Sequence, residues 1–210
     1  MEQMYFKYPR TLHLPWSLGS TSDDKFMSDT EHFNGKRIVI TEKMDGENTN
    51  MYSDKIHARS IDSNHHESRN WVKGLWGSIK HDIPEGWRIC GENLYAKHSL
   101  FYEELETYFM VFSIWNENNE CLSWGDTINV CNMLNLKTVP VIEILDFNVS
   151  YLRSLANTFD TGLKEGYVIR NVESFPFDEF SNNIGKWVRP KHVQTNQHWM
   201  FDMIIPNKLK

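Results

Sequence analysis

The stretch Glu42-Lys43-Met44-Asp45-Gly46-Glu47-Asn48 holds a single lysine in an acidic turn, and the expected fold is worked out from it. The apolar run Arg37-Ile38-Val39-Ile40 before it predicts a β-strand, and Asp45-Gly46 predicts a tight turn into a second strand over residues 49–52. A lysine fixed there can act as a nucleophile if burial, cationic neighbours or a metal ion lower its pKa from about 10.4. An exposed hairpin lysine is the simpler interpretation of the turn alone.

Four later segments change that interpretation. They are His57-Ala58-Arg59-Ser60, Cys90-Gly91-Glu92-Asn93-Leu94-Tyr95, Glu165-Gly166-Tyr167-Val168-Ile169-Arg170 and Gly185-Lys186-Trp187-Val188-Arg189. With the lysine turn they resemble, in the same order, the motifs of the covalent nucleotidyltransferases, which are the polynucleotide ligases and the mRNA-capping enzymes. One such motif is weak evidence, whereas five in the correct order are strong evidence. The resemblance covers residues 42 to about 191 of the 210.

The sixth position of the lysine motif indicates the branch of this superfamily. Capping enzymes and DNA ligases usually have Lys-x-Asp-Gly-x-Arg, whereas RNA ligases of the RNA ligase 2 type have asparagine at the last position. This chain has Asn48 there. The segments Thr11-Leu12-His13-Leu14-Pro15-Trp16 and Gly91-Glu92-Asn93-Leu94-Tyr95-Ala96 are more similar to RNA ligase family 5.

Composition is that of a single enzyme domain. A chain of 210 residues with 40% hydrophobic residues can bury a full core, and no apolar run approaches the ~20 residues that span a membrane. Three cysteines, Cys90, Cys121 and Cys131, are odd in number and lack metal-binding spacing, which favours reduced thiols in the cytoplasm. The net charge of −6 permits an RNA partner without demanding one, because local clusters set the field in a cleft. We expect a cytoplasmic monomer.

Hydrophobic patterning predicts an α+β fold with antiparallel sheets flanked by helices. The expected strands are 38–42, 49–52, 55–60, 87–94, 108–115, 166–171 and 184–189, and the expected helices are 69–81, 126–134 and 149–159. The resemblance implies a nucleotidyltransferase (ATP-grasp-like ligase) domain over residues 1–210, in which two sheets cradle the nucleotide. Only about 20 residues follow the last motif, too few for an oligonucleotide-binding barrel. His198-Trp199-Met200-Phe201 is expected to form a short closing helix.

The resemblance also implies the chemistry of the first step. Lys43 would attack the α-phosphorus of ATP and carry AMP, and Glu42 beside it would contribute to nucleotide binding. Asp45 and Glu165 would hold Mg²⁺ or Mn²⁺ through its waters, because Mg²⁺ keeps much of its hydration shell. Such an ion would neutralise phosphate charge and favour the neutral amine of Lys43.

Other motif residues would bind the nucleotide and the nucleic-acid end. The resemblance implies that Glu92 binds the ribose hydroxyls, that Arg59 lies beside the phosphate and the incoming end, and that Lys186 contacts the α-phosphate. Phe112 matches the aromatic residue that stacks on adenine, although an alternating apolar strand also supplies core phenylalanines. Asn48 and Arg59 would matter most in the later steps, where the ends are aligned.

The last motif departs from the family pattern. The family often has Lys-x-Lys, but this chain has Lys186-Trp187-Val188-Arg189, so the second cation is either Arg189 or Lys191. Arg189 is displaced by one residue from the usual position and is therefore expected on the opposite face of the strand. His13 and Lys25 precede the nucleophile and could either reach the pyrophosphate or lie on the surface.

These features predict an ATP-dependent RNA ligase that joins 3′-hydroxyl and 5′-phosphate ends through lysyl-AMP and adenylated-RNA intermediates. The expected partners are RNA ends in a nicked duplex. One alternative is a small DNA ligase or a nick-sealing enzyme that tolerates DNA, against which Asn48 and the missing barrel count. The other is an inactive relative that binds nucleotide or RNA, which is disfavoured because every ionisable motif position is filled.

Overall fold

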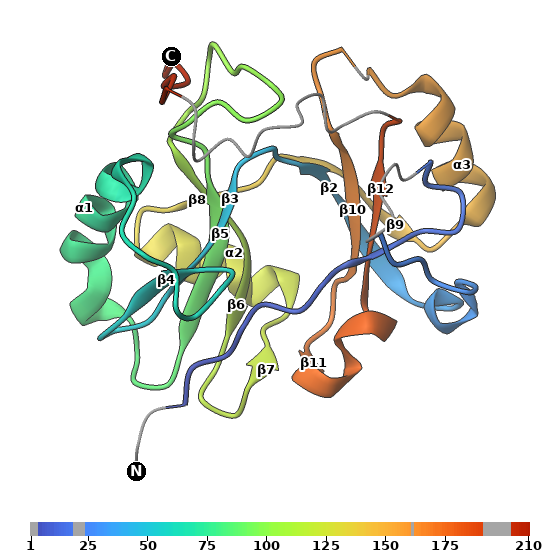
Figure 1. Cartoon of the computed structure of the whole chain (residues 1–210). Helices are drawn as coiled ribbons and strands as arrows, with labels where there is room; N and C mark the ends of the chain where they lie inside the picture. The colour runs from blue at the N-terminus through green and yellow to red at the C-terminus, as the bar shows by residue number, and fades with distance from the viewer. Residues whose placement is uncertain (1–3, 19–23, 161, 191–202) are drawn as a thin grey trace.

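The computed structural model describes residues 4–18, 24–160, 162–190 and 203–210. Two β-sheets face one another, and helices α1 (Asn70–Ile79) and α3 (Val149–Thr158) lie on the outer sides of the pair (Figure 1). The third helix is α2 (Trp124–Met133). This arrangement confirms the predicted α+β fold. Within the described parts of the chain, no helix is long and apolar enough to cross a membrane.

The first sheet carries the strands of the lysine motif and of the last two motifs. Its order is β1 (Leu12–His13), β12 (Ile184–Val188), β10 (Gly166–Asn171), β2 (Arg37–Lys43) and β9 (Val141–Asp146). Among these described strands only β1 and β12 pair in parallel. Because β10 lies between β2 and β12, it brings three sequence-distant motifs to adjacent positions in one sheet.

The second sheet carries the remaining motifs. Its order is β11 (Phe175–Pro176), β7 (Glu120–Cys121), β6 (Phe109–Trp115), β5 (Arg88–Asn93), β3 (Glu47–Met51) and β4 (Ile56–Ala58), and β8 (Lys137–Thr138) pairs with β6. Short 3₁₀ turns, η1 to η4, occupy Glu31–Phe33, Glu67–Arg69, Lys80–Asp82 and Phe177–Asn182. Strands β3 and β5 pair with each other, and their register places Asn48 directly opposite Glu92.

The lysine turn connects the two sheets and is not a hairpin. Strand β2 ends at Lys43 in the first sheet, and β3 begins at Glu47 in the second. Gly46 is required at this crossing, since a Cβ there would lie 2.4 Å from the carbonyl oxygen of Asn93. The interpretation of Lys43 as an exposed hairpin residue is therefore wrong, because both flanking strands are paired with other strands.

Alternation along β2 distributes its apolar side chains to two cores. Ile38 and Ile40 pack with Leu152 of α3 on the outer side of the first sheet, whereas Val39 packs with Trp124 of α2 on the other side. A separate cluster joins the second sheet to α1 through residues such as Val72 and Ile79. Both outer faces are thus covered, and the inner faces are left to form a site.

Most of the expected elements occur close to their predicted bounds. Helix α2 begins at Trp124 and not at 126, because the Ser123 hydroxyl accepts a hydrogen bond from the Asp126 amide and caps the helix. The edge strand β9 (Val141–Asp146) was not predicted, although four of its six residues are apolar, and its side chains are half-buried or exposed. The helix expected at residues 198–201 lies outside the described residues.

The C-terminal segment is tied to the loop between β5 and β6. Pro206 pairs with Ala96 and Leu209 with Leu105. Asn207 is buried, its Nδ2 donates to the Leu94 carbonyl at 2.8 Å, and its Oδ1 accepts from the Tyr102 amide at 2.9 Å. One amide side chain therefore satisfies backbone groups at the start and in the middle of the loop.

We expect Asn207→Ala to lower the free energy of unfolding by about 1–3 kcal/mol, because it leaves buried backbone groups without partners. Urea denaturation measures this change. Lys208→Ala is the matched control, since its Nζ lies 3.5 Å from Glu103 at the surface, where an ion pair contributes about 0–1 kcal/mol. Equal effects of the two substitutions would contradict the role assigned to Asn207.

Candidate active site

A cavity of about 260 Å³ lies between the two sheets. Residues from all five motifs of the sequence line it, together with the N-terminal segment. The lining residues are Tyr8, Pro9, Arg10, Thr11, Thr41, Glu42, Lys43, Met44, Asn48, Arg59, Glu92, Phe112, Trp124, Val139, Val168, Arg170, Ile184 and Lys186. Most of the candidate residues therefore line one cavity. Asp45, Glu165 and Arg189 are not among the lining residues.

Lys43 forms a buried ion pair with Glu165. Its Nζ lies 2.5 Å from Glu165 Oε2, and the side chains are 24% and 6% exposed. Burial alone would lower the pKa of Lys43, but the charges of Glu165, Glu92 and Asp45 together raise it above its ordinary value. Burial also raises the pKa of Glu165. The nucleophile candidate therefore rests as an ammonium ion, and it must lose a proton before it can attack.

Glu92 adds a second carboxyl group to this environment. Its Oε1 accepts a hydrogen bond from the Gly46 amide at 3.1 Å. Burial raises the pKa of Glu92 to about 8, and the nearby charges of Glu165 and Asp45 act in the same direction against Lys43. Near neutral pH the carboxyl group of Glu92 therefore binds a proton more readily than an ordinary carboxyl group does, and in its neutral form it can both accept and donate a hydrogen bond.

Asp45 is engaged by a loop. Its Oδ2 accepts three hydrogen bonds at 2.7 Å, from the amide and hydroxyl of Ser99 and from the amide of Leu100. Its own amide donates to the Tyr102 hydroxyl at 3.0 Å. The structure thus uses Asp45 to fix the lysine turn, a role that the sequence reasoning missed. Only its Oδ1 remains to face a metal ion.

The carboxylates suit a hydrated ion better than a protein cage. Among the described residues, no group of three or more His, Cys, Asp or Glu side chains could hold a metal ion by itself. Glu165, Glu92 and Asp45 nevertheless all act electrostatically on Lys43. One or two such carboxylates, with waters and nucleotide phosphates, form the usual setting of Mg²⁺. The donor set fits a divalent ion that arrives with the nucleotide.

Lys186 lies in the middle of β12 and lines the cavity. Burial, with the charge of Lys43 acting in the same direction, lowers the pKa of Lys186 to about 8. Arg189 follows β12, is buried, and donates its backbone amide to the Glu165 carbonyl at 3.0 Å. The assignment of Arg189 as the second cation stays a prediction, and Lys191 lies outside the described residues.

Glu42 is buried and lines the cavity. Its Oε2 lies 2.8 Å from the Nζ of Lys164, the residue that precedes Glu165. Lys164 is 42% exposed, so this pair lies at the edge of the site. A second contact thus joins the end of β2 to the start of β10.

Phe112 lies at the apolar end of the cavity with Met44, Val139 and Val168. Its ring meets Tyr8 edge-on, with centroids 5.1 Å apart. A half-buried ring that faces a cavity can stack on a planar base. Adenine stacking by Phe112 therefore stays a prediction with a suitable geometry.

The N-terminal segment supplies a cation that the sequence reasoning missed. Arg10 lines the cavity. Burial is the main cause that lowers the pKa of Arg59 and of Lys186, and the charge of Arg10 lowers both pKa values as a smaller cause. Arg59 Nε donates to the Tyr8 carbonyl at 3.2 Å, which fixes one arginine against the segment that carries the other. Repulsive cations held close together suit an anion such as a phosphate. No local motif surrounds Arg10, so only its place in the fold reveals it.

His13 and Lys25 lie outside the described lining. His13 is buried, with Nδ1 2.9 Å from Ser17 Oγ and Nε2 3.1 Å from Asp24 Oδ1. Lys25 is exposed, and its carbonyl accepts from the His13 amide. Lys25 lies at the surface, whereas His13 is buried, and contact of either residue with pyrophosphate stays a prediction.

Solved structures of RNA ligases share the fold. An RNA ligase of Naegleria gruberi with PPi has a TM-score of 0.53 at 16% identity, covering 80% of this chain and 53% of the other. Its E227A mutant with ATP and Mn gives 0.52 at 16% identity, covering 79% and 53%. An archaeal ATP-dependent RNA ligase gives 0.58 at 14% identity, covering 87% and 48%. The chain spans about half the length of these structures.

Comparison of the sequence itself gives the family. No curated protein matches the chain. The family model described as RNA ligase matches residues 36–188, which include all five motifs apart from Arg189. These residues form most of both sheets and most of the cavity lining. The chain therefore belongs to the RNA ligase family.

Proposed function

We propose that this RNA ligase family member uses ATP and joins RNA 5′-phosphate and 3′-hydroxyl ends through lysyl-AMP and adenylated RNA. The observation that carries the proposal is the buried Lys43, which lines a cavity between two sheets and is paired with Glu165. A lysine with one carboxylate at 2.5 Å and cations along the same cavity is suited to phosphoryl chemistry.

In the proposed first step the lone pair of Lys43 Nζ attacks the α-phosphorus of ATP. The N–P bond forms, the bond to the bridging oxygen breaks, and pyrophosphate leaves with the electron pair. The proton on Nζ passes by way of Glu165 Oε2, the acceptor 2.5 Å away, to solvent, and this leaves Glu165 as a carboxylate. A divalent ion held through its waters by Glu165 and Oδ1 of Asp45 would, when bound, neutralise phosphate charge.

The cavity supplies distinct contacts along the nucleotide. Phe112 would stack on adenine at the apolar end, Glu92 would bind the ribose hydroxyls, and Lys186 would meet the α-phosphate. Structures of Naegleria gruberi RNA ligase mutants contain ATP and Mn or AMP and Mn, which supports ATP and a divalent ion as the ligands here. Glu42 would support this end of the site by holding Lys164 at 2.8 Å.

The later steps transfer and then release AMP. An oxygen of the RNA 5′-phosphate attacks the phosphorus of lysyl-AMP and frees Lys43. The 3′-hydroxyl then attacks the activated 5′-phosphate, loses its proton, and AMP leaves with the bonding pair. Arg59, Arg10 and Asn48 lie at the cavity with donors suited to phosphate oxygens, so we assign them to the alignment of these ends.

Lys43→Ala should abolish labelling of the protein by ATP that carries a labelled α-phosphate, since the substitution removes the attacking amine. The matched control is Lys36→Ala. Lys36 precedes the same strand, and its Nζ donates to Asn182 and Asn183 away from the cavity, so labelling should persist. An adenylated peptide recovered from the Lys43→Ala protein would refute the assignment.

Glu92→Gln should change how stability depends on pH. The pKa of Glu92 rises from an ordinary 4.5 to about 8, so between these values the folded protein holds a proton that the unfolded chain releases. The contribution of Glu92 to the free energy of unfolding therefore falls as pH rises through this window. The variant should lose part of that fall and melt at least ~2 °C above wild type at pH 8, with little difference near pH 4.5.

Thermal unfolding monitored by circular dichroism across the same pH range tests this expectation. Glu103→Gln serves as the control, because its carboxylate is 68% exposed. If the Glu92→Gln and wild-type melting curves run parallel with pH, the carboxyl group does not hold the proton assigned to it.

Sealing of nicked duplexes separates RNA ligation from the DNA alternative. The wild-type protein with ATP and Mg²⁺ should seal nicks with RNA at the 3′-hydroxyl side faster than all-DNA nicks, because the family is that of RNA ligases. Product formation is followed on denaturing gels with matched sequences. Equal rates on all-DNA nicks would identify a DNA-tolerant ligase, and absence of both labelling and sealing would support an inactive relative.

A further inference from the structure

Asn48 presents a carboxamide to the cavity, and the two ends of that group differ. The oxygen only accepts hydrogen bonds, whereas the NH₂ group only donates them. A phosphate oxygen can be held only by the donating end. The chemical value of Asn48 therefore depends on which end faces the cavity, and that choice is set by its neighbours.

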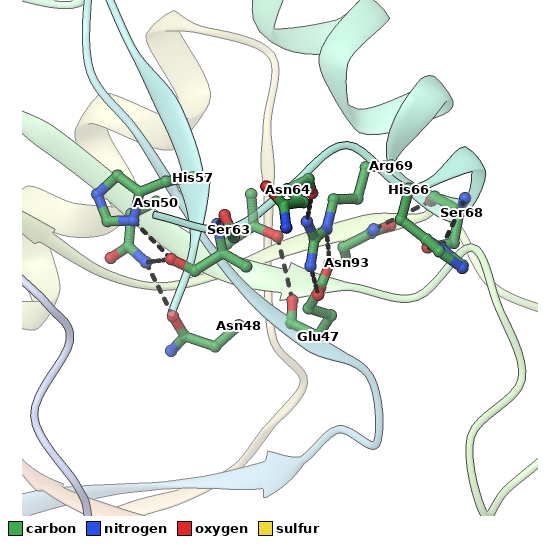
Figure 2. A network of polar contacts seen from close by, with 12 residues as sticks. Glu47, Asn48, Asn50, His57, Ser63, Asn64, His66, Ser68, Arg69 and Asn93 are labelled. Atoms are coloured by element: carbon green, nitrogen blue, oxygen red, sulfur yellow. Dashed lines mark hydrogen bonds and ion pairs between the residues drawn. The ribbon is translucent and has the colours of Figure 1, made fainter. Parts of the chain in front are cut away.

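Asn50 is the neighbour that sets it. Residues two apart on a strand share a face, and the Asn50 side chain lies fully buried beside Asn48 on β3. Asn50 Nδ2 donates to Asn48 Oδ1 at 2.9 Å and to the Ala58 carbonyl at 3.4 Å. Figure 2 shows the Asn50 nitrogen between these two oxygens, with the Asn48 nitrogen on the far side.

The surroundings leave Asn50 one orientation. The Ala58 carbonyl can only accept, so the group that faces it must be the NH₂ end of the amide. The opposite end, Oδ1, lies 3.0 Å from Cys90 Sγ, which donates to it. Burial raises the pKa of the Cys90 thiol to about 12, so the thiol keeps its proton. Both neighbours favour the same placement of the Asn50 amide.

We propose that Asn50 is a positioning residue that locks the Asn48 carboxamide with its NH₂ group toward the cavity, where it donates to a phosphate oxygen of the adenylated RNA end. The chain of donors runs from Cys90 Sγ to Asn50 Oδ1, from Asn50 Nδ2 to Asn48 Oδ1, and from Asn48 Nδ2 into the cavity. This inference rests on the proposed ligation, because it deepens the role of Asn48 in the joining step.

The polarity of the relay matches the other groups at the cavity. Arg59 and Lys186 can only donate hydrogen bonds, and both line the same cavity as Asn48. An asparagine free to turn would offer its oxygen about as often as its NH₂ group, and the oxygen would repel a phosphate. A buried network that satisfies every member fixes a single arrangement. Asn50 thus fixes the Asn48 carboxamide so that only its donating NH₂ group faces the cavity.

Asn50→Asp tests the lock with almost no change of shape. The substitution replaces the Nδ2 donor by an oxygen, so Asn48 Oδ1 loses its partner and turns. Single-turnover sealing of a pre-adenylated nicked RNA duplex should fall by about 10²-fold, while adenylation of Lys43 by ATP stays within about threefold of wild type. Sealing at the wild-type rate would overturn the proposal.

A double substitution distinguishes positioning from general damage. If Asn50 acts through Asn48, the variant with Asn48→Ala and Asn50→Asp should seal no more slowly than Asn48→Ala alone. Losses that multiply would mean that Asn50 acts independently of Asn48. Cys131→Ser is the control for substitution of a buried side chain, because Cys131 lies in another core cluster and does not line the cavity, and it should seal normally. A loss equal to that of Asn50→Asp would indicate core damage and overturn the proposal.

Asn48→Asp decides the question if Asn50→Asp does not fold. It keeps an oxygen for Asn50 Nδ2 and turns an acceptor toward the cavity, so sealing should fall as far as in Asn48→Ala. Normal sealing by this variant would show that the cavity needs no donor there. A wild-type protein that forms no lysyl-AMP and seals nothing would instead refute the proposed function, whatever the Asn50 variants do.

Discussion

The register of β10 between β2 and β12 is the constraint on which the site depends. Gly166 is opposite Lys43 on one side and Val188 on the other, so Glu165 reaches the amine of Lys43 while Lys186 lies along the same cavity. A Cβ at Gly166 would lie 2.0 Å from the Trp187 carbonyl oxygen, so only glycine allows the three strands to approach this closely. A slip of one residue would turn each of these side chains to the other face.

That geometry has an electrostatic consequence. The carboxyl groups of Glu165, Glu92 and Asp45 surround one lysine in a desolvated site, and the raised pKa of Lys43 shows that they outweigh its burial. Lys43, Glu92 and Glu165 therefore hold their protons more tightly than ordinary side chains of the same kind. In the proposed reaction a nucleotide with a divalent ion would change this balance, since the ion would compensate the carboxylates and lower the affinity of Lys43 for its proton. The stability lost to repulsion in the resting protein is a cost of such a site.

The fold class and the candidate residues that line the cavity could be predicted from the sequence, because both follow from short patterns. Lys43, Glu92 and Lys186 lie in motifs whose flanking strands alternate, so each could be assigned to a strand end or centre. Strand pairing is a long-range property, and for that reason Asp45-Gly46 indicated a turn but could not show that β2 and β3 enter different sheets. The membership of the chain in the RNA ligase family agrees with the order of the motifs.

Residues held by irregular segments could not be predicted in the same way. The three donors to Asp45 Oδ2 come from Ser99 and Leu100, in a loop that Asn207 fixes from more than 100 residues away in the sequence. Arg10 reaches the cavity on a segment outside any regular strand or helix. No local sequence pattern marks the contacts of Asp45 or the place of Arg10, because both depend on tertiary packing between segments that are distant in the sequence.

Strand β3 shows how such a site can be both polar and well defined. Its sequence, Glu-Asn-Thr-Asn-Met, has low strand propensity, yet it forms a central strand of the second sheet. Glu47 faces the α1 side and pairs with Arg69, whereas Asn48 and Asn50 face the inner side. Burying amides is costly unless each is satisfied, and here the carbonyl of Ala58 and the thiol of Cys90 satisfy Asn50 completely enough to leave Asn48 a single orientation. The polar residues of β3 therefore lower its strand propensity, but they can hold a hydrogen-bond donor in a fixed direction. An apolar strand has no side-chain donor to offer a phosphate.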